Sequence, residues 1–196
     1  MQSPSKKKHM GLIVAGMHSS GGKTAVTSLL LAAMRKRNFI VQPFKVGPDY
    51  IDPGFHFHYS AKHSINLDPW IMGREHILQA AKEFTENAFG IAEGVMGLFD
   101  GSDPTNDSGS TMEVGRWLRW PILLVVPCQN SGRSITAAIQ GFVAEAGGPE
   151  HFAGIILNQV KSESHADYLR KACASLQIPI LGALPKILEL RWPERH

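Results

Sequence analysis

Short apolar runs alternate with amphipathic segments along almost the whole chain. The runs lie at 12–15, 40–44, 89–92, 122–126, 155–157 and 180–184, and each ends in glycine, proline or polar residues. Between them, apolar residues recur at helical spacing near 23–37, 75–87, 110–119, 134–146 and 163–176. Strands that alternate with helices predict a doubly wound α/β fold, with helices on both faces of a mostly parallel sheet.

Residues 46–70 form the longest predicted loop. Loops of that length in compact domains are usually functional or disordered. In parallel α/β sheets, ligands bind at the carboxyl ends of the strands. The residues that directly follow each predicted strand are therefore the first candidates for chemistry.

The segment 16–24 (GMHSSGGKT) joins the first apolar run to the first helix and predicts a phosphate-binding loop. Backbone N–H groups would surround phosphate oxygens, and the helix N-terminus would add partial positive charge. Lys23 would reach the outer phosphates, and the Thr24 hydroxyl would hold Mg²⁺. The alternative is a glycine-rich turn with a chance lysine, but the strand–loop–helix context favours nucleotide contacts from Gly16, Ser19, Ser20, Gly21, Gly22, Lys23 and Thr24.

The first glycine of this loop falls one residue early. In the usual G-x-x-x-x-G-K-[ST] pattern it would stand at Met17, whereas the chain has it at Gly16. The fit to the general pattern is therefore imperfect.

A second candidate segment, 44–53 (FKVGPDYIDP), follows the second run. Its two carboxylates, Asp49 and Asp52, lie three residues apart in a loop that Pro48 and Pro53 stiffen. If the loop faces the phosphate loop, one carboxylate can hold Mg²⁺. Lys45 can then neutralise charge that develops on a transferred phosphoryl group. The alternative is an acidic turn whose aspartates bond to the local backbone.

A third segment, 91–101 (IAEGVMGLFDG), ends an apolar run in Glu93, in the place where P-loop enzymes put a second metal-site carboxylate. Asp100 is a further candidate for the metal or the reacting centre. Near the end of the chain, Asn158 could read an adenine edge and Pro185 could flank the ring. For Asn158 the alternative is a cap or a turn.

The histidines and cysteines give weaker signals. His56, His58 and His63 could form a metal site, but local hydrogen bonding, or contact of one of them with an anionic substrate, is favoured. Cys128 follows a strand without the tight elbow of a nucleophile, which predicts a structural thiol. Cys128 and Cys173 have no ligand or redox spacing, which favours a reducing cytoplasm.

Composition sets limits on the class of protein. The 196 residues suit one domain, and 43% apolar with 19% charged residues is ordinary for a globular protein. A net charge of +3 does not argue for nucleic acid. No apolar run approaches the roughly 20 residues that span a bilayer, and no secretory signal is evident. We expect a flexible tail over 1–10 and one domain over 11–196.

In this order, the segments resemble the synthetase domain of cobyrinic acid a,c-diamide synthases, from about Gly11 to His196. The most specific pieces are 44–56, 66–68 (NLD) and 93–101. The early position of Gly16 resembles this family's own form of the P-loop, which the related dethiobiotin synthetases share. Regulators of the ParA and MinD kind carry a lysine where this loop has His18. The resemblance implies a P-loop NTPase fold of the dethiobiotin synthetase type.

The resemblance further implies an ATP- and Mg²⁺-dependent ligase of cobalamin biosynthesis. The a and c carboxylates of a corrinoid would attack the γ-phosphoryl group, and ammonia would convert each acyl phosphate to an amide. We therefore expect catalytic roles for Lys23, Lys45, Asp49, Glu93 and Asp100, substrate contacts from Tyr50, Ile51 and His56, and metal contacts from Thr24, Asp52 and Glu93.

Members of this family usually continue past the motif at 193–196 (PERH) into a glutamine amidotransferase domain, whose cysteine makes the ammonia. The chain stops at that motif, and neither cysteine fits this role. We expect a synthetase domain that takes ammonia from solution or from a partner, and a homodimer is one option for its assembly. Nickel-sirohydrochlorin a,c-diamide synthase shares the motifs. A non-catalytic P-loop module also stays open, whereas the 47–53 loop disfavours a dethiobiotin synthetase.

Overall fold

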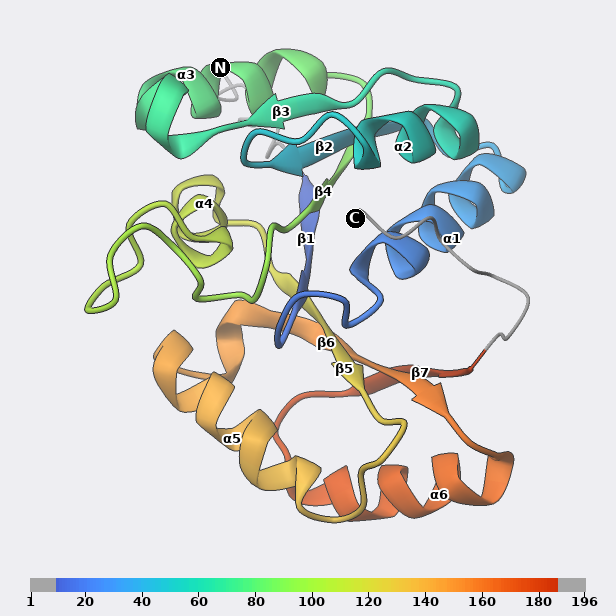
Figure 1. Ribbon diagram of the computed structural model, residues 1–196. Coiled ribbons are helices and arrows are strands. Elements are labelled where there is room, and N and C mark those ends of the chain that lie inside the picture. The colour runs from blue at the N-terminus through green and yellow to red at the C-terminus, as the bar shows by residue number, and fades with distance from the viewer. Residues whose placement is uncertain (1–9, 187–196) are drawn as a thin grey trace, which may run out of the picture.

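Seven parallel strands form one sheet in the computed structural model, which describes residues 10–186 (Figure 1). In chain order the strands are β1 (Gly11–Gly16), β2 (Val41–Val46), β3 (Ile65–Leu67), β4 (Phe89–Glu93), β5 (Ile122–Pro127), β6 (Phe152–Val160) and β7 (Ile180–Pro185). Their order across the sheet is β3-β2-β4-β1-β5-β6-β7. The doubly wound α/β prediction is confirmed. The predicted tail over 1–10 and the motif at 193–196 lie almost wholly outside the described residues.

Within residues 10–186, six α-helices connect the strands. They are α1 (Lys23–Lys36), α2 (Asp52–Ser60), α3 (Pro69–Phe84), α4 (Thr111–Leu118), α5 (Ile135–Ala146) and α6 (Glu163–Ala172). Short 3₁₀ turns at Pro149–His151 and Cys173–Ser175 precede β6 and follow α6. Across the described residues, no helix is long and apolar enough to cross a membrane.

Each face of the sheet carries its own apolar cluster, because neighbouring residues of a strand point to opposite faces. On one face, Ile13, Phe44 and Leu124 pack with residues of α3, α4, α5 and α6. On the other face, Val14, Ile91 and Val125 pack with residues of α1. This division of the helices gives the doubly wound architecture.

The strand register places polar residues of different segments beside one another at the carboxyl edge. In the three adjacent strands β2, β4 and β1, Lys45 pairs with Glu93, and Glu93 pairs with Val14. Paired residues on neighbouring strands share a face of the sheet. Lys45 and Glu93 therefore project together toward the face that α1 covers.

The predicted loop over 46–70 contains a helix and a strand, so this part of the prediction is wrong. Helix α2 buries Asp52, His56 and Ser60, which are spaced four residues apart as a helix requires. These buried residues recur at helical spacing but are polar, so a search for apolar residues at helical spacing does not find the helix. Strand β3 is only three residues long and pairs with the end of β2.

Helix α3 begins earlier than the predicted 75–87. The Asp68 side chain caps it by accepting hydrogen bonds from the backbone N–H groups of Trp70 (2.9 Å) and Ile71 (3.2 Å). Gly73 then breaks the helical geometry at φ 67°. The first turn is thus set apart from the rest of α3. Its side chains lie at the carboxyl edge of the sheet, because they follow directly after β3.

Candidate active site

The phosphate loop lies between β1 and α1, next to the end of β4. Gly22 caps α1 in the left-handed region at φ 93°, where a side chain would be strained. Lys23 and Thr24 follow as the first two residues of the helix. The Lys23 ammonium donates to the carbonyl oxygen of His18 at 3.2 Å and to that of Met96. Lys23 therefore bridges the phosphate loop and the loop after β4.

Thr24 is joined directly to the end of β4. Its hydroxyl donates to Glu93 Oε1 at 2.7 Å, across 69 positions of sequence. Glu93 is fully buried. The structure thus brings together the hydroxyl and the carboxylate that the sequence assigns to the metal.

Lys45 is the centre of a buried charge cluster. Its ammonium lies 2.7 Å from Asp52 Oδ2, 3.2 Å from Glu93 Oε1 and 3.8 Å from Asp49 Oδ2. It also donates to the carbonyl oxygen of Gly94 at 2.9 Å. Only 2% of the Lys45 side chain is exposed. A buried charge is costly unless it is paired, and here one cation faces three carboxylates.

His56 packs behind Glu93. Its Nε2 lies 2.8 Å from Glu93 Oε2, and its Nδ1 lies 3.0 Å from the Ser64 hydroxyl. The His56 side chain is 0% exposed. The ring, which the sequence assigned to substrate, thus has Glu93 and Ser64 as its hydrogen-bond partners in this structure.

Asp49 orders the loop that follows β2. Its Oδ1 accepts from the backbone N–H groups of Ile51 (2.9 Å) and Asp52 (3.2 Å). Asn66, in β3, donates from its side-chain amide to the carbonyl oxygen of Asp49 at 2.9 Å. The turn predicted as an alternative for these aspartates is thus present for Asp49. It coexists with the contact of Asp49 to Lys45.

The next two residues of this loop project outward. Tyr50 is 90% exposed and Ile51 is 51% exposed. Trp70 and Ile71, in the first turn of α3, are 81% and 76% exposed. Since Val46 and Leu67 pair at the ends of β2 and β3, all four side chains follow the carboxyl ends of adjacent strands. Large exposed apolar residues at one edge of the sheet make this edge a candidate binding surface.

Sequence reasoning missed Trp70 and Ile71. Both fell at the end of the predicted loop, where no motif singled them out. Trp70 directly follows Pro69 and the capping Asp68, and a cap signal of this kind could have located the start of the helix.

Asp100 lies in the turn after β4. Its Oδ2 accepts from the backbone N–H of Gly97 at 2.7 Å, and the side chain is exposed. Because the same loop carries Met96, which accepts from Lys23, it adjoins the phosphate loop. Asp100 is thus close in sequence to the site but is not part of the Lys45 cluster among the contacts described for it.

Asn158 lies against the phosphate loop from the end of β6. Its side-chain amide donates to the carbonyl oxygen of Gly21 at 3.0 Å, and its side chain is largely buried. A Cβ atom added to Gly22 would lie 2.0 Å from the same amide nitrogen. Pro185 is exposed at the end of β7, in register with Val160. Asn158 therefore supports the phosphate loop, and Pro185 lies at the outer edge of the sheet.

The other residues considered for chemistry are separate from this cluster. His58 packs edge-on to Tyr59, and His63 stacks on Phe57 with ring centroids 4.5 Å apart, whereas His56 bonds to Glu93 and Ser64. Within residues 10–186, no group of three His, Cys, Asp or Glu side chains is arranged to hold a metal by itself. Burial, with a smaller contribution from nearby Cys173, raises the pKa of the Cys128 thiol to about 12. The prediction of a structural thiol agrees with this value.

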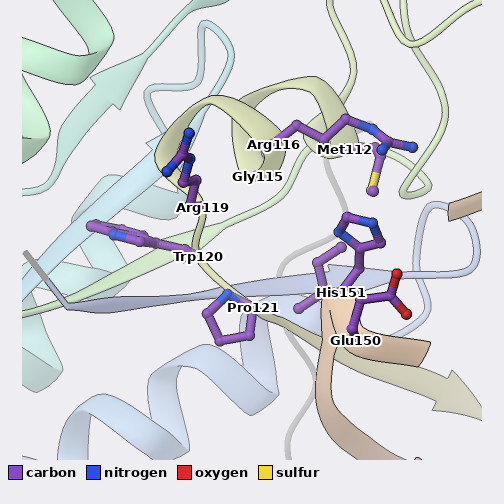
Figure 2. Close-up of a pocket in the computed structure, with 9 residues that line it drawn as sticks. Met112, Gly115, Arg116, Arg119, Trp120, Pro121, Glu150 and His151 are labelled. Atoms are coloured by element: carbon purple, nitrogen blue, oxygen red, sulfur yellow. The ribbon is translucent and has the colours of Figure 1, made fainter. Parts of the chain in front are cut away.

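A cavity of about 510 Å³ lies elsewhere on the molecule (Figure 2). It is lined by Trp120, Pro121 and Ile122 before and at the start of β5, and by Glu150 and His151 before β6. Arg116 and Arg119, from α4 and the residue after it, extend to opposite sides in this view. This is the amino edge of the sheet, whereas α/β folds bind ligands at the carboxyl edge. The cavity is therefore not the nucleotide site.

The sequence matches the family model described as the CobQ/CobB/MinD/ParA nucleotide binding domain over residues 12–196. It is 42% identical over 188 residues to a cobyrinate a,c-diamide synthase of Synechococcus, covering 95% of this chain and 41% of that protein. It is 43% identical to a hydrogenobyrinate a,c-diamide synthase of Brucella anthropi, covering 95% of this chain and 42% of that protein. The chain thus spans about two fifths of the length of these relatives.

Solved structures support the fold. Chloroplast FtsY from Physcomitrella patens superposes with a TM-score of 0.62 at 15% identity, covering 91% of this chain and 59% of that chain. A nucleotide-binding protein from Archaeoglobus fulgidus in complex with ADP superposes with a TM-score of 0.54 at 13% identity, covering 92% of this chain and 83% of that chain. At these identities, the likeness concerns the fold alone.

Proposed function

Because the chain belongs to the CobQ/CobB/MinD/ParA nucleotide-binding domain family, we propose that it uses MgATP to amidate the a and c carboxylates of cobyrinic or hydrogenobyrinic acid. We place this reaction in the cytoplasm. The observation that carries the proposal is the buried cluster of Lys45, Asp52 and Glu93 beside Lys23 and Thr24.

The phosphate loop supports the nucleotide half of the proposal. Lys23 and the start of α1 would bind the phosphates, with the loop residues Gly16, Ser19, Ser20, Gly21 and Gly22 around them. The chemistry of the donors fits Mg²⁺, which prefers oxygen ligands, uses few from the protein and takes the rest from water and phosphate. Thr24, Glu93 and Asp52 would hold the Mg²⁺ ion, and the bound ion would neutralise charge on the phosphates.

The proposed reaction has two steps. An oxygen of the substrate carboxylate attacks the γ-phosphorus, the bond from that phosphorus to the ADP oxygen breaks, and ADP leaves. The nitrogen of ammonia then attacks the acyl carbon, phosphate leaves with its oxygen, and the nitrogen loses a proton to give the amide. A carboxylate is a poor acceptor for ammonia until one of its oxygens becomes part of this leaving group.

The Lys45 cluster supports the first step. A cation held at the carboxyl edge, beside the phosphate loop, can stabilise negative charge on the transferred phosphoryl group. The three carboxylates around it keep the ammonium in one place, since it has 2.7 Å and 3.2 Å contacts to Asp52 and Glu93. Asp49, on the same lysine, would position the substrate carboxylate from the adjoining loop.

The exposed residues of the same edge support a large acceptor. Tyr50 and Ile51 would contact the ring, and Trp70 and Ile71 would extend that surface along the start of α3. A corrinoid offers an extensive apolar face with carboxylates at its rim, which matches an apolar surface next to a phosphoryl-transfer site. We propose that Asp100 lies at this end of the site too, where it would shield the acyl phosphate.

The nitrogen source would be ammonia, either free or from a glutamine amidotransferase domain or partner. The test incubates the protein with cobyrinic acid, ATP, Mg²⁺ and ammonium and follows products by mass spectrometry. We expect ADP, phosphate and two successive mass changes of hydroxyl replaced by amine, and no products from Lys23→Met. A folded protein that binds MgADP but amidates neither cobyrinic nor hydrogenobyrinic acid would refute the proposal. Amidation of nickel sirohydrochlorin instead would reassign the substrate.

A further inference from the structure

We propose that His56 is a positioning residue, which fixes the Glu93 carboxylate so that one chosen oxygen faces the metal–nucleotide site. This inference rests on the Mg²⁺ role proposed above for Glu93. It differs from the substrate contact that the sequence indicated for His56.

The two oxygens of Glu93 have separate partners. Oε2 lies 2.8 Å from His56 Nε2. Oε1 accepts from the Thr24 hydroxyl at 2.7 Å and lies 3.2 Å from the Lys45 ammonium. Because a carboxylate that is tied at both oxygens cannot rotate, Oε1 is held toward the first turn of α1.

The chemistry of the ring decides the direction of this bond. An ionised carboxylate only accepts hydrogen bonds, so His56 Nε2 must carry the hydrogen that it donates. The other ring nitrogen, Nδ1, exchanges a hydrogen bond with the Ser64 hydroxyl at 3.0 Å. Partners on both nitrogens fix the orientation of the ring, and a ring held in this way can orient the carboxylate that it bonds to.

The helix explains why the ring reaches Glu93. Asp52 and His56 lie one helical turn apart on the buried stripe of α2. Asp52 contacts Lys45 at 2.7 Å, and His56 contacts Glu93 at 2.8 Å. One face of α2 thus supports both members of the Lys45–Glu93 pair, which the sheet register sets side by side.

Three substitutions separate the Nε2 bond from the rest of the side chain. His56→Gln keeps an amide nitrogen near the place of Nε2, whereas His56→Asn keeps one near Nδ1, and His56→Ala removes both. Ser60→Ala is the matched control, because Ser60 lies on the same buried stripe and its hydroxyl bonds only to backbone groups. These are the carbonyl oxygens of His56 (2.7 Å) and Lys62 (3.0 Å) and the backbone N–H of Lys62 (3.0 Å).

The measurement is the binding of Mn²⁺ with ADP, by isothermal titration or by electron paramagnetic resonance of Mn²⁺. No corrinoid or turnover is needed. We expect His56→Asn and His56→Ala to weaken Mn²⁺ binding by about 10- to 100-fold. His56→Gln and Ser60→Ala should stay near wild type, and ADP binding without a divalent cation should not change in any variant.

Equal Mn²⁺ binding in His56→Asn, His56→Gln and wild type would overturn the inference. So would a loss of ADP binding without metal in proportion to the loss with it, because that pattern indicates general damage to the site. Thermal unfolding of each variant shows whether the fold is intact. If Mn²⁺ binding responds as expected while cobyrinic acid is not amidated, the inference stands and only the proposed function fails.

Discussion

The Thr24 hydroxyl donates a 2.7 Å hydrogen bond to Glu93 Oε1. Thr24 is the second residue of α1, and Glu93 is the last residue of β4, the strand adjacent to β1. The bond therefore joins the phosphate loop to the neighbouring strand at the point where both would meet Mg²⁺. The two segments contribute to one site because the strand order puts their carboxyl ends together.

Replacing Thr24 with Ala should weaken MgADP binding more than binding of ADP alone. A hydrogen bond to a charged group contributes about 1.5–3 kcal/mol, which corresponds to roughly 10- to 150-fold in the dissociation constant. Thr24→Ser keeps the hydroxyl and should bind nearly as the wild type does. Titration calorimetry with and without Mg²⁺ measures both constants. Equal losses with and without Mg²⁺ would contradict a role of Thr24 toward the metal.

Replacing Lys45 with Met should strongly destabilise the protein. The lysine is the buried cation that faces Asp49, Asp52 and Glu93, and removing one partner of a buried ion pair costs about 3–5 kcal/mol. Urea unfolding measures the loss. Lys82→Met, on an exposed position near the end of α3, is the control and should change stability by less than about 0.5 kcal/mol. An unchanged urea midpoint for Lys45→Met would contradict this prediction, because it would mean that the three carboxylates do not need the cation for stability.

Replacing Asn158 with Ala should loosen the phosphate loop. The substitution removes the 3.0 Å bond to the Gly21 carbonyl oxygen and leaves that acceptor without this donor. We expect a stability loss of about 1–3 kcal/mol and weaker binding of ADP and GDP alike. If Asn158 instead reads the adenine edge, the substitution would weaken ADP binding and leave GDP binding as it was. Comparison of the two nucleotides distinguishes these roles.

Replacing Trp70 with Ala should raise the KM for the proposed corrinoid substrate and leave MgADP binding unchanged. Loss of a large apolar contact at a binding surface costs about 1–2 kcal/mol, or roughly 5- to 30-fold. Phe84→Ala is the matched control, since Phe84 is an exposed aromatic residue at the far end of the same helix. Steady-state kinetics with each variant gives the comparison. Equal KM values for Trp70→Ala and wild type would remove α3 from the substrate surface.

Cys128 should resist alkylation in the folded protein. Its pKa is raised from 9.0 to about 12, mainly by burial, so the thiol stays protonated up to strongly alkaline pH. At pH 8 the thiolate fraction is then about one in ten thousand, and thiolate is the reactive form. Iodoacetamide should modify neither Cys128 nor buried Cys173 before unfolding, and both afterwards. Rapid modification of native Cys128 would contradict its burial.

Much of the fold follows from local pattern. Strands β1, β4 and β5 and helices α1, α4 and α5 lie where apolar runs and helical spacing predicted them, because each buries an apolar face. Helix α2 escaped prediction because its buried stripe, Asp52, His56 and Ser60, is polar. Its burial depends on Lys45 and Glu93, which come from other strands.

The sequence by itself determined the family, the α/β class and the residue types of the site, since those depend on motifs and on local periodicity. Only the tertiary structure decided their partners. Register set Lys45 beside Glu93, and α2 then placed His56 behind Glu93 rather than at the surface. Asn158 reached Gly21 across 137 positions. Such contacts depend on strand order and on the docking of helices, and neither is encoded in the neighbours of a residue along the chain.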